Sequence, residues 1–201
     1  KKIIYLKEEM VKTPHDADNM YGWGKLMGEL TLKAYYKDFG MQSASCRYFT
    51  VFGERGIENH AVIAMIARAF IKQNPFIVWG TGEQIRNWTY VKDIVEGTLL
   101  AAEKISDGTS VNLGTMERTR VRDAVIEILS YSKHDAVIET RPNMPTGPYN
   151  RVADNLLAKK ILGWYPKVKF IDGVHRTIDW YFQTKSKRVI AQNLDKLLTE
   201  R

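Results

Sequence analysis

The sequence predicts an α/β protein with a mainly parallel sheet. Short apolar segments alternate with amphipathic ones along the 201 residues, and Gly- or Pro-containing turns separate them. Short strands alternating with helices are typical of parallel sheets covered by helices. No internal repeat or low-complexity segment interrupts this order.

The first predicted element is a helix over residues 20–39. Its possible N-terminal caps are Asp16, Asp18 and Asn19. Gly40 supplies the stop signal. Its predicted apolar stripe consists of Leu26, Leu30 and Ala34.

The same reasoning continues to the C-terminus. Strands are predicted at 43–53, 75–80, 86–91, 109–114 and 136–140, with a Pro/Gly-rich loop at 142–148. Further helices are predicted at 60–74, 92–105, 121–132, 155–164 and from 172, the last with a continuation through 189–198 left open. Thr119 and Asp154 are the expected caps of the helices that follow them, and Gly163 is the expected end of helix 155–164.

Composition excludes several functional classes. The net charge is +7, but Lys and Arg are dispersed, with no block longer than residues 185–188, which favours a solvated surface or a small polyanion such as a nucleotide diphosphate over nucleic acid. No apolar run reaches ~18 residues, so no membrane partner is expected. The single Cys46 excludes an internal disulfide, predicts a buried free thiol and fits a cytoplasmic location.

Tyr-x-x-x-Lys occurs three times, as Tyr21–Lys25, Tyr165–Lys169 and Tyr181–Lys185. The spacing by itself does not separate a catalytic acid–base pair from two residues one helical turn apart. For the first copy the alternative is a plain amphipathic turn with Trp23 packed inside.

Arginines recur in loops between the predicted elements, at Arg55, Arg86, Arg141 and Arg151. A planar guanidinium makes paired, charge-assisted hydrogen bonds to phosphate oxygens. Each could instead be a surface arginine in a salt bridge. Their recurrence favours Arg86 and Arg151 as phosphate ligands.

Five segments in order resemble the extended short-chain dehydrogenase/reductase family of NAD-dependent nucleotide-sugar epimerases and dehydratases. "YGWGKLMGE" resembles its Tyr-x-x-x-Lys helix, "RYFTVFGERG" the segment that follows, and "FIVWGTGEQIRNWTYVKDIVEG" the strand, turn, arginine and helix of its substrate domain. "VNLGT" and "PTGPYNRVADN…LGWYPK…GVHRTIDWY" resemble the last segments. The resemblance covers about 12–183 and selects Tyr21–Lys25 over the other two pairs.

The fold that this resemblance implies is a partial Rossmann-like parallel sheet plus a smaller α/β substrate-binding lobe. Residues 1–58 would be a remnant of the NAD-binding Rossmann domain, and residues 59–201 the substrate lobe and C-terminal helix, with interleaved segments. The sequence contains no Gly-x-x-Gly-x-x-Gly fingerprint. We therefore expect the chain to be the C-terminal part of such an enzyme, with the N-terminal Rossmann half missing.

The resemblance also implies roles for single residues. Tyr21 would be the base that removes a sugar hydroxyl proton, and Lys25 would favour the phenolate and hold the ribose of NAD. Tyr48 would lie beside the nicotinamide. Gly22 and Gly24 would allow a cofactor or strand to approach closely.

The implied substrate contacts lie in the later segments. They are Thr50, which stands where the family usually has asparagine, Phe76, Val78 and Trp79 beside the nucleotide base, and Arg86 and Arg151 at the diphosphate. Asp154 is expected to be a helix cap, and Asp93 a cap or a ligand. No metal is implied.

The predicted function is an NAD-dependent nucleotide-sugar epimerase of the 4-epimerase kind, or a fragment of one. A 4,6-dehydratase and a non-catalytic nucleotide-sugar binding or assembly module are the alternatives. The chain alone is expected to bind NAD weakly or not at all and to lack activity. Because strand 43–49 would have an open edge, a homo-oligomer or a completing N-terminal half is the expected partner, besides the nucleotide diphosphate sugar.

Overall fold

A computed structural model describes residues 5–12, 15, 17, 19–147 and 149–199, except for the side chains of residues 151 and 199. The helices of this part are α1 (Met20–Phe39), α2 (Ala61–Phe70), α3 (Val91–Lys104), α4 (Val121–Tyr131), α5 (Leu156–Leu162), α6 (Phe170–Thr184) and α7 (Lys187–Thr199), with a 3-10 turn, η1, at Glu8–Met10. The strands are β1 (Ser43–Tyr48), β2 (Val51–Phe52), β3 (Phe76–Trp79), β4 (Ile85–Arg86), β5 (Thr89–Tyr90), β6 (Asp107–Leu113), β7 (Thr119–Arg120), β8 (Ile138–Arg141) and β9 (Asn150–Arg151).

The strands pair mainly in parallel, which confirms the predicted α/β class. β1 pairs with β6, β2 with β5 and β3 with β8, all in parallel. The central β4 of a three-stranded sheet is parallel to β9 and antiparallel to β7. The hydrogen-bonded strands thus form small sheets rather than one continuous sheet.

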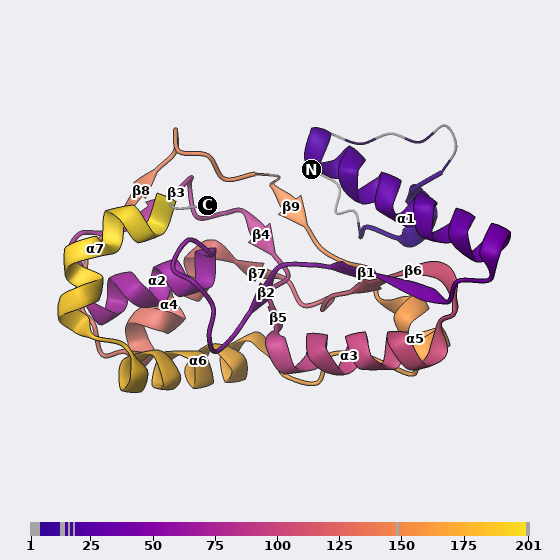
Figure 1. The fold of residues 1–201 in the computed structure, drawn as a ribbon. Coiled ribbons are helices and arrows are strands. Elements are labelled where there is room, and N and C mark those ends of the chain that lie inside the picture. Colours follow the sequence, from indigo (N-terminus) through magenta and orange to yellow (C-terminus); the bar gives the residue numbers. More distant parts are fainter. Residues whose placement is uncertain (1–4, 13–14, 16, 18, 148, 200–201) are drawn as a thin grey trace.

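Two hydrophobic clusters lie at opposite ends of the molecule (Figure 1). The larger cluster joins α2, α4, α6 and α7 to β3 and β5, and the smaller one joins α3, α5 and β6. α1 lies beside β1 and β6 at the end of the smaller cluster (Figure 1). Because β1 pairs with β6, we propose that α1 and β1, from the predicted first unit of residues 1–58, form one unit with β6 from later in the chain.

The first helix has the predicted bounds, because a capping residue marks its start and a glycine marks its end. Asn19 caps it by accepting a hydrogen bond from the Gly22 amide at 2.9 Å, and Gly40 ends it in the left-handed conformation. Asp16 and Asp18 lie outside the described residues. Of the predicted stripe, Leu26 is buried, Leu30 is half-buried and Ala34 is exposed.

Polar bonds hold α1 against the β1–β6 pair. Glu29 accepts two hydrogen bonds from the Arg47 guanidinium, at 2.7 and 2.6 Å, and a third from the Ser110 hydroxyl at 2.8 Å. Burial raises the pKa of the Glu29 carboxyl, but the hydrogen bonds from Arg47 and Ser110 outweigh burial and leave that pKa lowered. The carboxylate is therefore the anchor of the helix.

Several predicted boundaries are wrong. The strand predicted at 43–53 divides into β1 and β2, and that at 86–91 into β4 and β5. The break in the first lies at Phe49–Thr50, where the Thr50 carbonyl accepts from the Thr89 amide at 2.9 Å and so joins β2 to β5. Thr119 lies in β7, and α4 begins after Arg120 without a side-chain cap.

The C-terminal segment is two helices, because Lys185 leaves the helical conformation between α6 and α7. The Lys185 ammonium lies 3.1 Å from the buried carboxylate of Glu58. This ion pair fixes the end of α6, and α7 folds back over α2 (Figure 1).

Cys46 is half-buried in β1, not fully buried as predicted, and burial raises the pKa of its thiol. In the described part of the chain, helices long and apolar enough to cross a membrane are absent.

Candidate functional site

The Tyr21–Lys25 pair lies in the first turns of α1, directly after the Asn19 cap. Tyr21 is 75% exposed, and the Lys25 ammonium lies 5.2 Å from the centroid of its ring. The ammonium is thus beside the phenol, as the spacing predicts, but it lies over the ring face. Trp23 is itself 36% exposed, so the alternative of a first turn with this ring packed inside is weakened.

The helix surface near this pair is open. A Cβ added at Gly24 would meet no atom within 4 Å, so no described strand approaches there. An open helix face with a phenol and an ammonium fits the ribose end of NAD. The given sequence has no Gly-x-x-Gly-x-x-Gly turn of the kind that binds a pyrophosphate.

Tyr48 and Thr50 lie at and just after the end of β1. Tyr48 is 54% exposed, and its hydroxyl shares a 3.1 Å hydrogen bond with the Thr98 hydroxyl of α3. Thr50 is half-buried. Within the described residues, no hydrogen bond or ring contact joins either side chain to Tyr21 or Lys25.

A separate cavity of about 200 Å³ lies over α2 and β3. Its lining residues come from α2, β3, β4, α4, α7 and the loops before α2, β4, β5 and β9: Asn59, Ala61, Ala64, Met65, Arg68, Ile77, Val78, Trp79, Gln84, Arg86, Trp88, Val121, Pro145, Thr146 and Leu198. The cavity therefore brings together the predicted contacts Val78, Trp79 and Arg86. Phe76 is fully buried in the larger cluster and does not line it, so the predicted substrate contact of Phe76 does not fit its position.

Arg86 is held at this cavity by the backbone. Its two terminal nitrogens donate to the carbonyls of Ile85, at 2.8 Å, and of Thr146. In the sheet register Arg86 lies opposite Arg151 of β9. The two predicted phosphate ligands are thus neighbours in the backbone, while the side chain of Arg151 lies outside the described part.

Arg68 and Trp88 are among the cavity residues that sequence reasoning missed. Arg68 is 8% exposed, and burial lowers the pKa of its guanidinium, against an opposing attraction from Asp195. Trp88 is 2% exposed and stacks on Phe170, with ring centroids 5.2 Å apart. The signal for Arg68 was a lone cation inside the apolar run "AVIAMIARAF".

The two aspartates have structural partners. Asp93 is buried, and its carboxylate accepts from the Val168 amide at 2.9 Å. Asp154 accepts from the Leu156 amide at 2.9 Å, but the N-cap residue of α5 is Asn155, so Asp154 lies one residue before the cap position predicted for it. Among the described residues, no cluster of three His, Cys, Asp or Glu could hold a metal ion.

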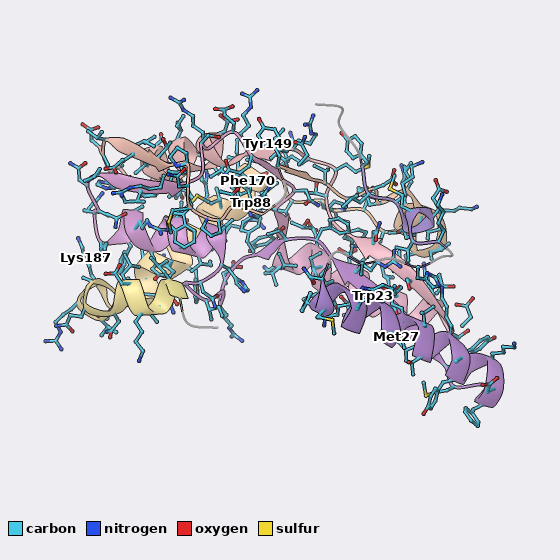
Figure 2. All side chains as sticks on the ribbon, turned by 90° about the horizontal axis from the view of Figure 1, so that it is seen from above. Trp23, Met27, Trp88, Tyr149, Phe170 and Lys187 are labelled. Carbon is cyan, nitrogen blue, oxygen red and sulfur yellow. The ribbon has the colours of Figure 1, made fainter. Side chains whose placement is uncertain are left out.

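The cavity and the Tyr–Lys pair lie in different parts of the molecule. Figure 2 shows Trp23 and Met27 on α1 at one end, with Trp88 and Phe170 close together in the other lobe. A substrate that reached both would extend from the larger cluster across the molecule toward α1.

Comparison with known proteins identifies relatives of this chain. The model of the NAD dependent epimerase/dehydratase family matches residues 2–114. GDP-mannose 3,5-epimerase 1 of Oryza sativa is 32% identical over 171 residues, which cover 83% of this chain and 45% of the relative. An uncharacterized UDP-glucose epimerase of Bacillus subtilis is 32% identical over 159 residues, covering 79% and 50%.

Solved structures agree with these relatives. UDP-glucuronic acid 4-epimerase from Bacillus cereus, in complex with UDP-glucuronic acid and NAD, is 28% identical, with a TM-score of 0.81 over 92% of this chain and 58% of that one. UDP-glucose 4-epimerase from Thermotoga maritima, with UDP-glucose, is 27% identical, with a TM-score of 0.76 over 82% and 53%. The chain spans about half of the length of the curated relatives it matches.

One prediction is overturned by the family match. The chain was expected to be only the C-terminal part of such an enzyme, without its N-terminal Rossmann half. The family model aligns from residue 2, near the start of the chain, and runs through α1 and β1, so this placement is wrong. With a family match over residues 2–114 and this agreement in fold, the chain belongs to the NAD-dependent epimerase/dehydratase family.

Proposed function

We propose that this protein is an NAD-dependent nucleotide-sugar epimerase of the 4-epimerase kind. The observation that carries the proposal is the cavity, because apolar strand residues and an arginine fixed by the backbone line it together. Apolar walls suit the flat faces of a nucleobase, and arginine suits a diphosphate. The solved relatives that hold UDP-glucuronic acid and UDP-glucose support this assignment.

In this proposal Val78 and Trp79 contact the base, and Arg86 binds the diphosphate. A cavity of about 200 Å³ is smaller than the roughly 300–1,000 Å³ of sites that enclose a whole drug-sized ligand. It suits one part of a nucleotide sugar, with the sugar lying outside it. Arg151, opposite Arg86 in the sheet, is the second proposed phosphate ligand. Thr50 is a further proposed contact to the substrate.

Tyr21 is the proposed base, and Lys25 keeps positive charge beside it. The phenolate oxygen takes the proton of a sugar hydroxyl, and the nearby ammonium stabilises the negative charge before transfer. When NAD is bound, it supplies the hydride acceptor. Tyr21, Lys25 and Tyr48 are the residues proposed to lie near its nicotinamide and ribose.

A nucleotide-sugar binding module without redox chemistry is the second candidate. The described residues build the cavity, whereas the sequence lacks the glycine turn that usually holds the pyrophosphate of NAD. Cofactor absorbance of the purified protein, together with conversion of a UDP-sugar in the presence of NAD, separates the two candidates.

Self-association is also proposed for this protein. α1 exposes large apolar side chains, among them Met20 at 85% and Phe39 at 75%. Sedimentation of the full chain at several concentrations measures it directly, and a concentration-independent monomer would contradict it.

The proposed nucleotide site is tested by titrating UDP, GDP and dTDP into the wild type and Arg86→Ala. We expect Arg86→Ala to weaken binding by roughly 1.5–3 kcal/mol, the scale of a hydrogen bond to a charged group. Arg188→Ala is the matched control, because Arg188 is exposed on α7. Equal and small losses in both variants would indicate general attraction to a basic surface and would contradict the site.

A further inference from the structure

Two buried hydrogen-bond donors, Arg68 and Trp88, line the cavity and have no role in the proposed function. Both side chains are more than nine-tenths buried, and both line the cavity. Their chemistry bears on which nucleotide the cavity accepts.

Arg68 is a costly residue to bury. It lies on α2 among Ala64, Met65 and Ala67, which are apolar and buried. Within the described part of the chain its guanidinium donates no hydrogen bond to another group, and the opposite charge that acts on it is that of Asp195, an exposed residue of α7. Buried arginines normally have hydrogen-bond acceptors, because removing the charge from water is strongly unfavourable.

Trp88 shows the same feature in a neutral group. Its indole Nε1 is buried without a hydrogen-bond partner among the described residues. The ring is fixed by stacking on Phe170 at an interplanar angle of 29°. A buried tryptophan N–H usually finds an acceptor, so an unsatisfied one in a cavity wall indicates that the acceptor comes from a ligand.

Carbonyl acceptors in the cavity wall are already used by the protein itself. The Trp79 carbonyl accepts from the Gln84 side chain at 2.8 Å, and the Thr146 carbonyl accepts from Arg86. Asn59 adds one buried side-chain oxygen, Oδ1, to this wall, against the donors of both Arg68 and Trp88. A group that fills the cavity must bring acceptors with it.

We propose that Arg68 and Trp88 donate hydrogen bonds to carbonyl oxygens of the nucleobase and thereby set the base specificity. Uracil and guanine carry a carbonyl at the ring position where cytosine and adenine carry an amino group. An amino group would place its own N–H donors against these donors and leave all of them unsatisfied. The protein then prefers UDP over CDP and GDP over ADP. This inference rests on the proposed nucleotide site.

The test titrates these four nucleoside diphosphates into the wild type, Arg68→Met, Trp88→Phe and the surface control Arg188→Met. In the wild type we expect UDP to bind roughly 10–100-fold more tightly than CDP, and GDP than ADP, the range of one hydrogen bond to a charged group. Arg68→Met brings both ratios close to one. Trp88→Phe keeps the stacking on Phe170, removes the N–H and reduces the ratios partly.

A second readout does not depend on nucleotide binding. Met replaces a buried charge by an apolar side chain of similar length, so Arg68→Met raises the thermal midpoint of the free protein, while Arg188→Met leaves it unchanged. A lower midpoint would mean that Arg68 is a structural residue and would overturn the inference.

The outcomes separate this inference from the proposed function. Equal binding of UDP and CDP by the wild type, or an unchanged ratio in Arg68→Met with all nucleotides weakened alike, overturns base reading and leaves the nucleotide site intact. No binding of any of the four nucleotides overturns the proposed site and this inference together.

Discussion

The two helices that carry the proposed functional residues are held in opposite ways. α1 has 20 residues, and Leu26 is its one buried side chain. α2 has 10 residues, and every residue from 62 to 69 is buried. α1 is anchored by the Glu29–Arg47–Ser110 hydrogen bonds, whereas α2 is enclosed by α4, α6 and α7.

This difference in packing gives α1 an open surface site and gives α2 an enclosed cavity. A helix held by a few polar bonds leaves its surface open, so Tyr21 can reach a ligand and removing its hydroxyl changes little in the fold. A helix enclosed by apolar packing can support a cavity with a buried cation such as Arg68. We expect the α1 site to respond to charge and pH, and the α2 site to respond to changes of shape.

The largest expected effect is that of Tyr21→Phe on catalysis. The change keeps the ring under the Lys25 ammonium and removes only the hydroxyl, so conversion of a UDP-sugar with added NAD should slow by about 10²–10⁴-fold. The thermal midpoint should stay at the wild-type value, because the residue is 75% exposed. Wild-type turnover in this variant would show that the Tyr–Lys pair is not an acid–base pair.

Breaking the polar anchor of α1 is the next largest effect. Glu29→Gln should lower the free energy of unfolding of this region by roughly 1.5–3 kcal/mol, since it weakens charged, half-buried hydrogen bonds. Hydrogen exchange should show faster exchange in α1 and no change in α2.

Glu96→Gln is the matched control for this variant, because Glu96 pairs with Lys167 at 2.6 Å in an exposed ion pair. Such pairs contribute about 0–1 kcal/mol. Equally small losses of unfolding free energy in both variants would show that the Glu29 hydrogen bonds do not anchor α1. Faster amide exchange in α2 of Glu29→Gln would show that the two helices are not held independently.

In the third Tyr-x-x-x-Lys copy the tyrosine is buried and supports the fold, whereas Tyr21 in the first copy is exposed. The Tyr181 hydroxyl is buried and donates to Glu58 at 2.9 Å, and burial raises the pKa of Tyr181, so the group stays a protonated donor. Tyr181→Phe should cost about 1–2 kcal/mol of stability, with the Lys185 ammonium still beside the carboxylate. Turnover should not change. A loss of turnover without a loss of stability would reverse the assignment of the two tyrosines.

The smallest expected effect is a pH dependence confined to α1. The pKa of Glu29 is lowered in the folded protein, so the unfolded chain binds its proton first and the stabilisation is present above the ordinary glutamate pKa of about 4.3. It is lost as the pH falls below that value and through the lower folded pKa. Exchange of α1 amides measured between neutral and acid pH should show this loss in the wild type and not in Glu29→Gln.

The sequence by itself determined the first helix, the α/β class and the family. The bounds of α1 follow from Asn19 and Gly40, which are backbone signals that act within a few residues. Ordered motifs from Tyr21 to Tyr181 indicated the epimerase/dehydratase family, which the family match supports. The same resemblance implied that Val78, Trp79 and Arg86 contact one nucleotide ligand, and all three line the cavity.

Only the tertiary structure decided which residues meet across the chain. Arg68 and Trp88 share a cavity with Thr146 and Leu198, and no local pattern encodes contacts over such separations. The end of α6 at Lys185 likewise depends on Glu58, more than a hundred residues away. Phe76 shows the same limit, since Phe76 and Val78 share one face of β3 and both are buried, but only Val78 reaches the cavity. Local signals act through the backbone, whereas burial and pairing depend on what the rest of the fold brings alongside.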